Sequence, residues 1–349
     1  MPIIEAYDLV KIYSSRSGTV HALAGLNLSV PEGRVEGLLG PNGAGKTTTV
    51  KVLNTLIKPD RGSARVDGID VLADPQRVRR IIGASGQYAA VDENLTGLEN
   101  LEMVGRLYHL GVRQSRRRAA ELVEAFGLTA AGNRPVKGFS GGMRRRIDLA
   151  GALVNKPRIL FLDEPTTGLD PRSRLGMWET ISELVREGTT VLLTTQYLEE
   201  ADALADHISV IDQGRVIAKG TADELKAQVG GHRVVVTLVD AADSGAAREV
   251  LARYGSAEPS GADGGRELEV AVQQGPVALQ RVLADLEQQD IRLHDAGMRR
   301  PTLDDAFLTL TGHPADGADG TDRADEIDPD GRAKPTDHQD TPRRRETVV

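Results

Sequence analysis

The residues with the clearest chemical meaning form an eight-residue run that matches the pattern G-x-x-x-x-G-K-[ST]. The run and the residue after it read Gly40, Pro41, Asn42, Gly43, Ala44, Gly45, Lys46, Thr47 and Thr48. Glycines let successive backbone N–H groups turn towards phosphate oxygens, and the positive end of a following helix adds to the attraction. In such a loop the lysine neutralises the outer phosphates and the threonine hydroxyl binds Mg²⁺. We therefore expect a binding site for a nucleoside triphosphate. A chance glycine turn is the alternative.

Two adjacent acids follow a second apolar stretch, and they could hold a metal ion and activate water. Residues 159–162 read Ile-Leu-Phe-Leu and lead directly into Asp163 and Glu164. Open α/β sheets bind ligands at the carboxyl ends of their strands, which is where these acids would stand. We expect Asp163 to hold Mg²⁺ together with Thr47, and Glu164 to orient and deprotonate the attacking water. An acidic pair that only begins a helix is the alternative.

The elements that must position these groups alternate between apolar strands and helices over residues 1–230. That alternation, with glycine-rich turns, is typical of an α/β domain with a mainly parallel sheet. We expect buried strands at 35–39, 159–162 and 190–193, and a hairpin over 207–218 that turns at Gln213 and Gly214. Two helix starts carry capping boxes, Thr96 with Glu99 and Thr221 with Glu224. We also expect an amphipathic helix over 116–126.

The chain changes character after Gly231. Strand patterns at 233–239 and 266–272 and helix patterns at 246–254 and 277–288 predict a small α+β module over residues 231–311. From residue 312 to 349 the chain is rich in Asp, Gly, Pro and Arg and has almost no large apolar residues. Such a segment cannot offset its ordering entropy, so we expect a disordered tail.

Composition excludes several classes of function. The formal net charge of -8 leaves no basic excess with which to neutralise phosphates, so nucleic acid is not an expected partner. The chain has 0 cysteines, so it can form neither a disulfide framework nor a thiolate metal site. No stretch reaches the roughly 18 uninterrupted apolar residues of a spanning helix. If the protein works at a membrane, another polypeptide must cross it.

A third motif narrows the class of nucleotide-binding protein. Ser140, Gly141 and Gly142, followed by Met143, resemble the signature of ABC ATPases, in which glutamine is commonest at the position of Met143. The resemblance implies a P-loop NTPase of the ABC ATPase type with a helical subdomain. It also implies a second phosphate-facing helix N-terminus, where the serine and the glycine amides contact a γ-phosphate. An ordinary helix-entry turn is the alternative.

The same resemblance implies roles for four further residues. Tyr13 stands where an aromatic ring stacks on adenine, although a core tyrosine is the alternative. Gln87 matches the glutamine that links the Mg²⁺ site to the permease, and Asp170 matches the loop that crosses the dimer interface; the alternatives are a polar loop residue and a simple turn. Gln196 replaces the usual histidine beside the γ-phosphate. It can donate and accept hydrogen bonds but cannot become a cation; a helix cap is the alternative.

Three longer stretches, 140–150, 194–202 and 300–307, are similar to the daunorubicin/doxorubicin resistance ATP-binding proteins. This resemblance implies an ATP-hydrolysing, Mg²⁺-dependent subunit of a drug exporter. It would act as a homodimer with a separate transmembrane permease subunit, held peripherally at the cytoplasmic face of the cell membrane. Phe307 and Leu308 would anchor such pairing, unless they fill the module's own core.

Two other classes of function remain open. A non-transport ABC ATPase would act on a soluble macromolecular partner; translation-type members carry two motif sets in one chain and DNA-repair types carry a long coiled coil. This chain has one motif set, and residues 48–139 are too few for a coiled coil. A regulator that binds ATP without turnover is the third class, and an intact Glu164 argues against it.

Overall fold

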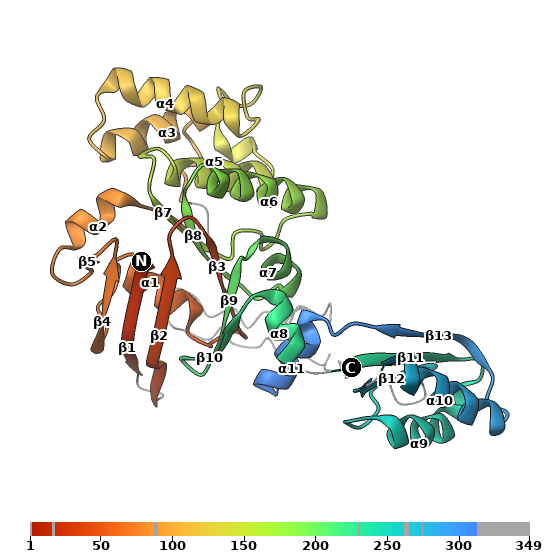
Figure 1. The fold of residues 1–349 in the computed structure, drawn as a ribbon. Coiled ribbons are helices and arrows are strands. Elements are labelled where there is room, and N and C mark those ends of the chain that lie inside the picture. The colour runs from red at the N-terminus through yellow and green to blue at the C-terminus, as the bar shows by residue number, and fades with distance from the viewer. Residues whose placement is uncertain are drawn as a thin grey trace, which may run out of the picture. The chain divides into compact units, whose positions relative to one another are not determined.

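A six-stranded sheet carries the chain segments in which the predicted phosphate loop and acids stand. Its strand order is β10-β9-β3-β8-β7-β6, and all neighbouring pairs are parallel except the β9–β10 hairpin. The strands are β3 (Val35–Leu39), β6 (Ile82–Ser85), β7 (Ile159–Asp163), β8 (Thr190–Thr195), β9 (His207–Asp212) and β10 (Arg215–Gly220). The predicted mainly parallel α/β sheet is therefore confirmed (Figure 1).

The computed structural model describes residues 2–15, 18–86, 90–228, 231–261, 265–273 and 275–312. Gln87 lies outside these residues, as do residues 313–349 of the predicted tail over 312–349. None of the helices in the described part of the chain is long and apolar enough to cross a membrane.

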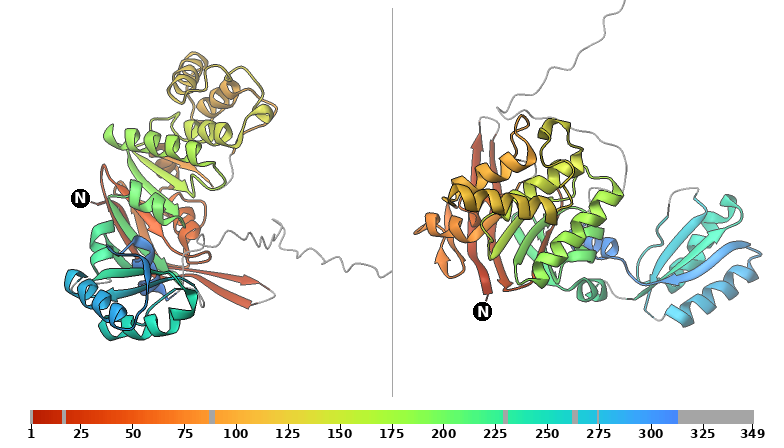
Figure 2. Two further views of the ribbon diagram at one scale, coloured as in Figure 1. Left: turned by 90° about the vertical axis from the view of Figure 1, so that its right-hand side faces the viewer. Right: turned by 90° about the horizontal axis from the view of Figure 1, so that it is seen from above.

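One face of the central sheet packs against an antiparallel sheet of order β2-β1-β4-β5, with helix α1 in the same core. Ile159 and Phe161 of β7 point to this side, where Phe161 is fully buried. Burying a phenylalanine of this kind contributes about 1.5–3 kcal/mol. The elements are β1 (Pro2–Ser15), β2 (Gly18–Pro31), β4 (Arg61–Val66), β5 (Ile69–Asp70), α1 (Lys46–Leu53) and α2 (Pro75–Ile81). β1 and β2 form the long red ribbon in Figure 2.

Helices cover the opposite face of the central sheet. Since successive side chains of a strand point to opposite faces, the other residues of β7 point to these helices. Leu160 and Leu162 of β7 point to this side and share a core with α3, α4, α5 and α6. The helical elements are α3 (Gly97–Leu107), α4 (Val112–Ala125), the short 3₁₀ turn η1 (Val136–Gly138), α5 (Gly141–Ala152) and α6 (Pro171–Arg186). The capping box of Thr96 and Glu99 begins α3 as predicted. These elements include the predicted helical subdomain (Figure 1).

The hairpin β9–β10 turns at the predicted residues. Gln213 and Gly214 have φ angles of 46° and 75°. Positive φ at both central residues is the geometry whose twist matches that of paired strands. Helix α7 (Leu198–Leu204) precedes the hairpin and α8 (Ala222–Gln228) follows it, and the second predicted capping box, Thr221 with Glu224, begins α8.

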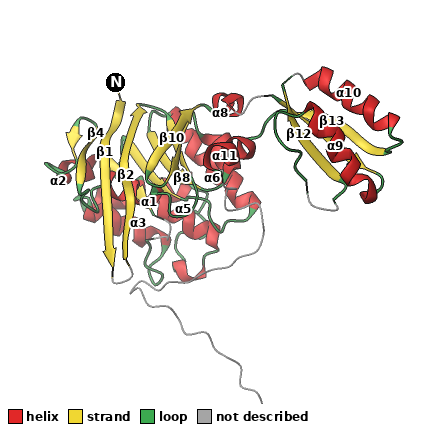
Figure 3. Cartoon of the chain, turned by 90° about the horizontal axis from the view of Figure 1, so that it is seen from below, coloured by secondary structure: helices red, strands yellow, loops and turns green. Residues whose placement is uncertain are grey.

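The C-terminal module is an antiparallel sheet of order β12-β11-β13 with two helices on one face (Figure 3). Its elements are β11 (His232–Leu238), η2 (Ala241–Asp243), α9 (Ser244–Tyr254), β12 (Glu267–Val272), α10 (Gly275–Gln288) and β13 (Leu293–Arg299). Val234, Val236 and Leu238 alternate into the core beneath the helices. The sequence analysis missed β13, whose polar and glycine-containing stretch shows no alternation of large apolar residues.

The last described helix, α11 (Leu303–Thr311), packs against helices α7 and α8. Phe307 is 1% exposed and shares a core with Leu198 of α7 and Leu225 of α8. Leu308, the next residue, is 47% exposed. The prediction that both residues anchor a partner is therefore wrong for Phe307, whose side chain is already buried within this chain.

Phe307→Ala should lower the free energy of unfolding by about 3–5 kcal/mol, because it opens a cavity between three helices. Leu308→Ala is the matched control and should cost less than about 1 kcal/mol, since half of that side chain stays in water. Urea denaturation followed by circular dichroism measures both. Equal losses in the two variants would contradict the packing of α11.

Candidate active site

The phosphate loop joins β3 to α1, and its lysine is held inside it. Lys46 is the first residue of α1 and is 5% exposed. Its Nζ donates to the carbonyl oxygens of Gly40, at 2.6 Å, and Pro41, at 3.1 Å. The ammonium group therefore stands within the loop at the positive end of a helix, where an anion is stabilised.

Two glycines of this loop lie too close to other segments for any side chain. A Cβ at Gly40 would lie 2.2 Å from the carbonyl oxygen of Ile211, and one at Gly45 would lie 2.5 Å from that of Ala22. Gly45 also has a φ of 109°, which L side chains rarely adopt. The turn of the β9–β10 hairpin holds the loop from outside: the N–H of Gly214 donates to the carbonyl of Ala44 at 2.9 Å, and its carbonyl accepts from the N–H of Ala24 at 3.0 Å.

Asp163 lies at the end of β7 and gathers hydroxyl groups from two other segments. Its Oδ1 accepts from the hydroxyls of Thr47, at 3.1 Å, and Thr194, at 2.6 Å. The aspartate is 6% exposed. A carboxylate and a hydroxyl oxygen at this separation fit the oxygen ligands that Mg²⁺ takes beside bound phosphates. The predicted metal residues Thr47 and Asp163 are therefore in contact.

Glu164 has an unusual backbone. Its φ of 49° places it in the left-handed region, which costs a residue other than glycine about 1–2 kcal/mol. The N–H of Glu164 donates to both the hydroxyl and the carbonyl of Thr194 at 3.1 Å, and its Oε2 accepts from the hydroxyl of Thr167 at 3.2 Å. The carboxylate is thus available as an acceptor at the end of the strand, next to Asp163.

Gln196 follows β8, the strand between β3 and β7. Helix α7 begins two residues later, its N-cap is Tyr197, and no side-chain hydrogen bond caps it. Gln196 therefore does not cap this helix, as the alternative interpretation of the sequence had it. The Oε1 of Gln196 is buried and has no hydrogen-bond partner among the described residues. A buried acceptor without a donor is costly, and a bound ligand or water would relieve that cost.

Two further helices begin at predicted site residues. Ser140 is the N-cap of α5, and its hydroxyl accepts from the N–H of Met143 at 3.3 Å. Gly141 is exposed, and Gly142 would bring a Cβ within 2.7 Å of the Ser173 hydroxyl. Asp170 is the N-cap of α6, and hydrogen bonds from Ser173 lower the pKa of its carboxyl group. Both helix starts present polar groups at the surface.

Tyr13 lies on β1 opposite Val20 of β2, and 42% of it is exposed. The alternative of a core tyrosine therefore does not hold. Lys11 Nζ lies 5.7 Å from the centre of its ring. An exposed aromatic ring of this kind can stack on a base.

The sequence analysis missed a set of buried polar residues around the acids. Glu200 of α7 is fully buried and accepts from Thr166 at 2.8 Å and from the indole of Trp178 at 3.3 Å. Burial raises the pKa of Glu200. Arg145 and Asp148 of α5 are 6% and 7% exposed. Only their place beside the Ser-Gly-Gly motif could have pointed to them.

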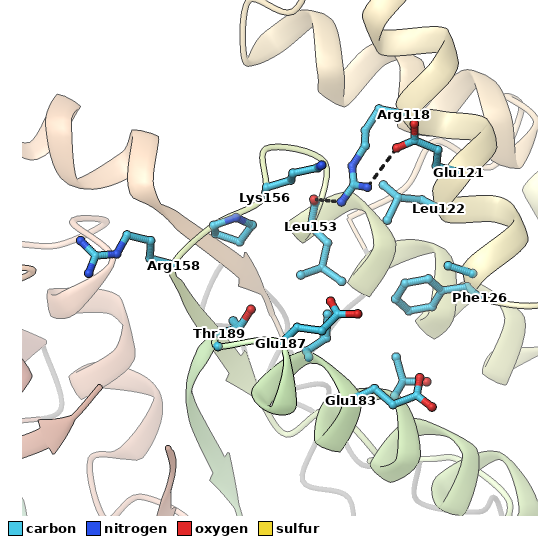
Figure 4. Close-up of a pocket in the computed structure, with 15 residues that line it drawn as sticks. Arg118, Glu121, Leu122, Phe126, Leu153, Lys156, Arg158, Glu183, Glu187 and Thr189 are labelled. Carbon is cyan, nitrogen blue, oxygen red and sulfur yellow. Dashed lines mark hydrogen bonds and ion pairs between the residues drawn. The ribbon is translucent and has the colours of Figure 1, made fainter. Parts of the chain in front are cut away.

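A cleft of about 580 Å³ lies between α4, the loop before β7 and the end of α6 (Figure 4). None of the predicted site residues lines it. Arg118 spans part of the cleft, where it donates to the carbonyl of Leu153 at 3.0 Å and pairs with Glu121 at 3.2 Å. The cleft is therefore separate from the phosphate loop and the acids.

Comparison with known proteins decides the family. Residues 23–167 match the model of the ABC transporter family, and residues 220–311 match that of the C-terminal domain of DrrA1-3-like ATP-binding proteins. The daunorubicin resistance ATP-binding protein DrrA2 of Streptomyces coeruleorubidus is 53% identical over 88% of this chain and 96% of its own length. This chain belongs to the ABC transporter ATP-binding protein family.

Two further relatives of this ABC ATPase show the same relationship. The daunorubicin/doxorubicin resistance ATP-binding protein DrrA of Streptomyces peucetius is 49% identical over 93% of this chain and 96% of its own. A dimeric ATP-binding cassette solved in a post-hydrolysis state with ADP and Pi is 27% identical, with a TM-score of 0.58, over 62% of this chain and 98% of its own. The predicted family, fold and ATPase activity are confirmed: the chain binds and hydrolyses ATP as a transporter subunit.

The position of Gln196 in this ABC ATPase generates a kinetic prediction. Gln196→Ala should lower ATP turnover by roughly ten- to a thousand-fold, the range for removing one preorganised hydrogen-bond donor. The pH profile of wild-type turnover should show no transition near pH 6.5 from a group at this position. Gln196→His is expected to introduce such a transition. Steady-state kinetics across pH 5.5–9 measures both. Unchanged turnover in Gln196→Ala would contradict the prediction that Gln196 contacts the γ-phosphate.

Proposed function

We propose that this ABC ATPase works as a homodimer that drives a separate transmembrane permease and exports drug-like molecules. The observation that supports the dimer is that the phosphate-binding groups form two separate sets. One set consists of the phosphate loop and Asp163, while the exposed N-terminus of α5, with Ser140 and Gly141, is a second helix start suited to an anion. In a dimer, the Ser140 turn of one protomer would close over the nucleotide held by its partner's loop. The solved ADP-bound relative is dimeric.

Within each site, the residues divide the work of hydrolysis. Lys46 neutralises the outer phosphates, and Glu164 orients and deprotonates the attacking water. Gln196 donates its amide N–H to the γ-phosphate and can accept from the water through its buried Oε1. Thr47 and Asp163, together with Gln87, would hold Mg²⁺, which would neutralise charge that develops on the phosphate oxygens. Tyr13 would stack on the adenine, and Asp170 would lie at the dimer interface.

An apolar groove offers a surface for the permease. It has a volume of about 380 Å³ and is lined by Leu56, Leu107 and Tyr108 beside Ile82 and Ala84 of β6. Leu107 is 72% exposed and Leu56 is 67% exposed. Exposed apolar surface of this kind marks an interaction site. β6 ends one residue before Gly86, and Gly86 contacts the buried Arg145 beside the acids. A permease segment in the groove would therefore lie on a strand that leads towards the site.

The names of the relatives support a proposal for the substrate, and the role of an ATP-hydrolysing subunit supports one for the location. Two relatives, each matched over 96% of its own length, are named for resistance to daunorubicin or to daunorubicin and doxorubicin, which supports an exporter of drugs of this kind. We place the subunit peripherally at the cytoplasmic face of the cell membrane, where ATP is available. The division into 1–230, 231–311 and 312–349 is retained as part of this proposal, with α11 packed on the first part.

Glu164→Gln should bind ATP but hydrolyse it orders of magnitude more slowly, because the amide cannot take the proton of the attacking water. With ATP and Mg²⁺ the variant should accumulate as a dimer of about twice the 37.4 kDa chain mass. Light scattering after gel filtration measures the mass, and ADP in place of ATP is the control. A chain that stays monomeric with ATP would count against the shared sites.

Leu107→Asp should weaken association with the permease by at least tenfold, since a carboxylate in an apolar interface is left without a partner. Ile217→Asp is the matched control: Ile217 is 42% exposed on β10, the edge of the central sheet opposite β6. Co-purification with a co-expressed transmembrane permease subunit measures association. If both variants bind equally well, the groove is not the docking surface.

A further inference from the structure

One buried guanidinium touches the backbone on both sides of the predicted water-activating residue. Arg145 lies on α5, the helix that Ser140 begins, and is 6% exposed. Its Nε donates to the carbonyl of Pro165 at 2.8 Å, and its Nη2 donates to the carbonyls of Asp163 and Glu164 at 3.1 and 3.0 Å. Three successive carbonyl oxygens of the acidic turn therefore converge on a single side chain.

The same side chain reaches a second segment of the site. Its Nη1 donates to the carbonyl of Gly86, and it lies 3.7 Å from Oδ2 of Asp148, one turn further along α5. Asp148 in turn accepts from the N–H of Ala90 at 2.8 Å and from the hydroxyl of Ser85. One helix turn thus holds the two described residues, Gly86 and Ala90, that flank 87–89.

The backbone that Arg145 holds includes Glu164, the residue with the left-handed conformation. Three carbonyls of an extended strand cannot all face one point, because successive peptide units alternate in direction. They converge here because Glu164 has a φ of 49°. A positive φ at a bulky residue persists only where its surroundings hold it. The planar fork of a guanidinium can donate to several carbonyls at once, and its charge strengthens each hydrogen bond in a buried place.

We propose that Arg145 is a positioning residue for ATP hydrolysis: it holds Glu164 in the left-handed conformation and so sets where the carboxylate stands. It also joins the backbone of Glu164 to α5, so a movement of the Ser140 helix would be transmitted to Glu164 and to Gly86. The inference rests on the proposed role of Glu164 as the base. Asp148 supports Arg145 as its buried counter-charge.

The test compares Arg145→Lys and Arg145→Met with Asp148→Asn in the full chain. Lysine keeps the charge but loses the planar fork, methionine loses both, and asparagine keeps a hydrogen-bond acceptor while losing the charge. We expect kcat to fall by roughly tenfold in Arg145→Lys and about a hundredfold in Arg145→Met, the cost of a misplacement of about 1 Å. The KM for ATP should change by less than about threefold, because uniform binding is retained.

Arg118→Met is the matched control. Arg118 is also an arginine that donates to two backbone carbonyls, those of Leu153 and Val154, but these lie at the other end of α5. Figure 4 shows the bond to Leu153. This variant should lower the melting temperature without changing kcat. Melting temperatures are measured for all variants, so that a loss of stability is separated from a loss of turnover.

Three results would overturn the proposal. The first is wild-type kcat in Arg145→Lys and Asp148→Asn, and the second is an equal fall of kcat and of ATP affinity that tracks the melting temperature. The third is a fall of kcat in Arg118→Met as large as that in Arg145→Lys. If Arg145→Met does not fold, Arg145→Lys and Asp148→Asn decide the question. Glu164→Gln is run beside them: normal turnover in that variant refutes the base itself, whereas its loss with normal Arg145→Lys refutes only the positioning role.

Discussion

One oxygen atom, Oδ1 of Asp163, joins the segments from which the ATP site is made. It accepts hydrogen bonds from Thr47, the last residue of the phosphate loop, and from Thr194, in β8. These segments meet because β3, β8 and β7 are parallel neighbours whose carboxyl ends fall at one edge: Leu39 is in register with Thr195, and Asp163 with Thr194. A charged acceptor that is almost fully buried has to be satisfied by such donors, so the aspartate fixes the distance between the loop and the acidic strand.

The second acid could not reach the same edge by strand geometry alone. Neighbouring residues of an extended strand point to opposite faces, so Asp163 and Glu164 would diverge if β7 simply continued. The positive φ of Glu164 ends that alternation immediately after the strand. The conformation is stabilised from both sides, by Thr194 at the N–H of Glu164 and by Arg145 at its carbonyl. Arg145, 19 positions earlier in the chain, therefore contacts the backbone at the point where the alternation ends.

The features that sequence could predict are those decided by local chemistry. The phosphate loop, the turn at Gln213 and Gly214 and the capping boxes each need particular residue types within a few positions, and all lie where they were expected. Features that depend on distant contacts could not be predicted. β13 carries no alternation of large apolar residues, and it is a strand because β11 offers it a free edge. Phe307 is a core residue only because α11 returns to α7 and α8, and nothing in its own stretch distinguishes that core from a docking surface.

The contacts of Gly214 have a consequence for protein engineering. The phosphate loop is recognised as a sequence of eight residues, yet its shape depends on a hairpin more than 160 positions further along the chain and on β2, because Gly214 bonds to Ala44 and Ala24 at once. Transplanting the eight residues into a new scaffold would carry the glycines and the lysine but leave those outer supports behind. A graft would have to include the hairpin turn and the β2 backbone to reproduce the cradle, which makes the portable unit a patch of tertiary structure rather than a motif.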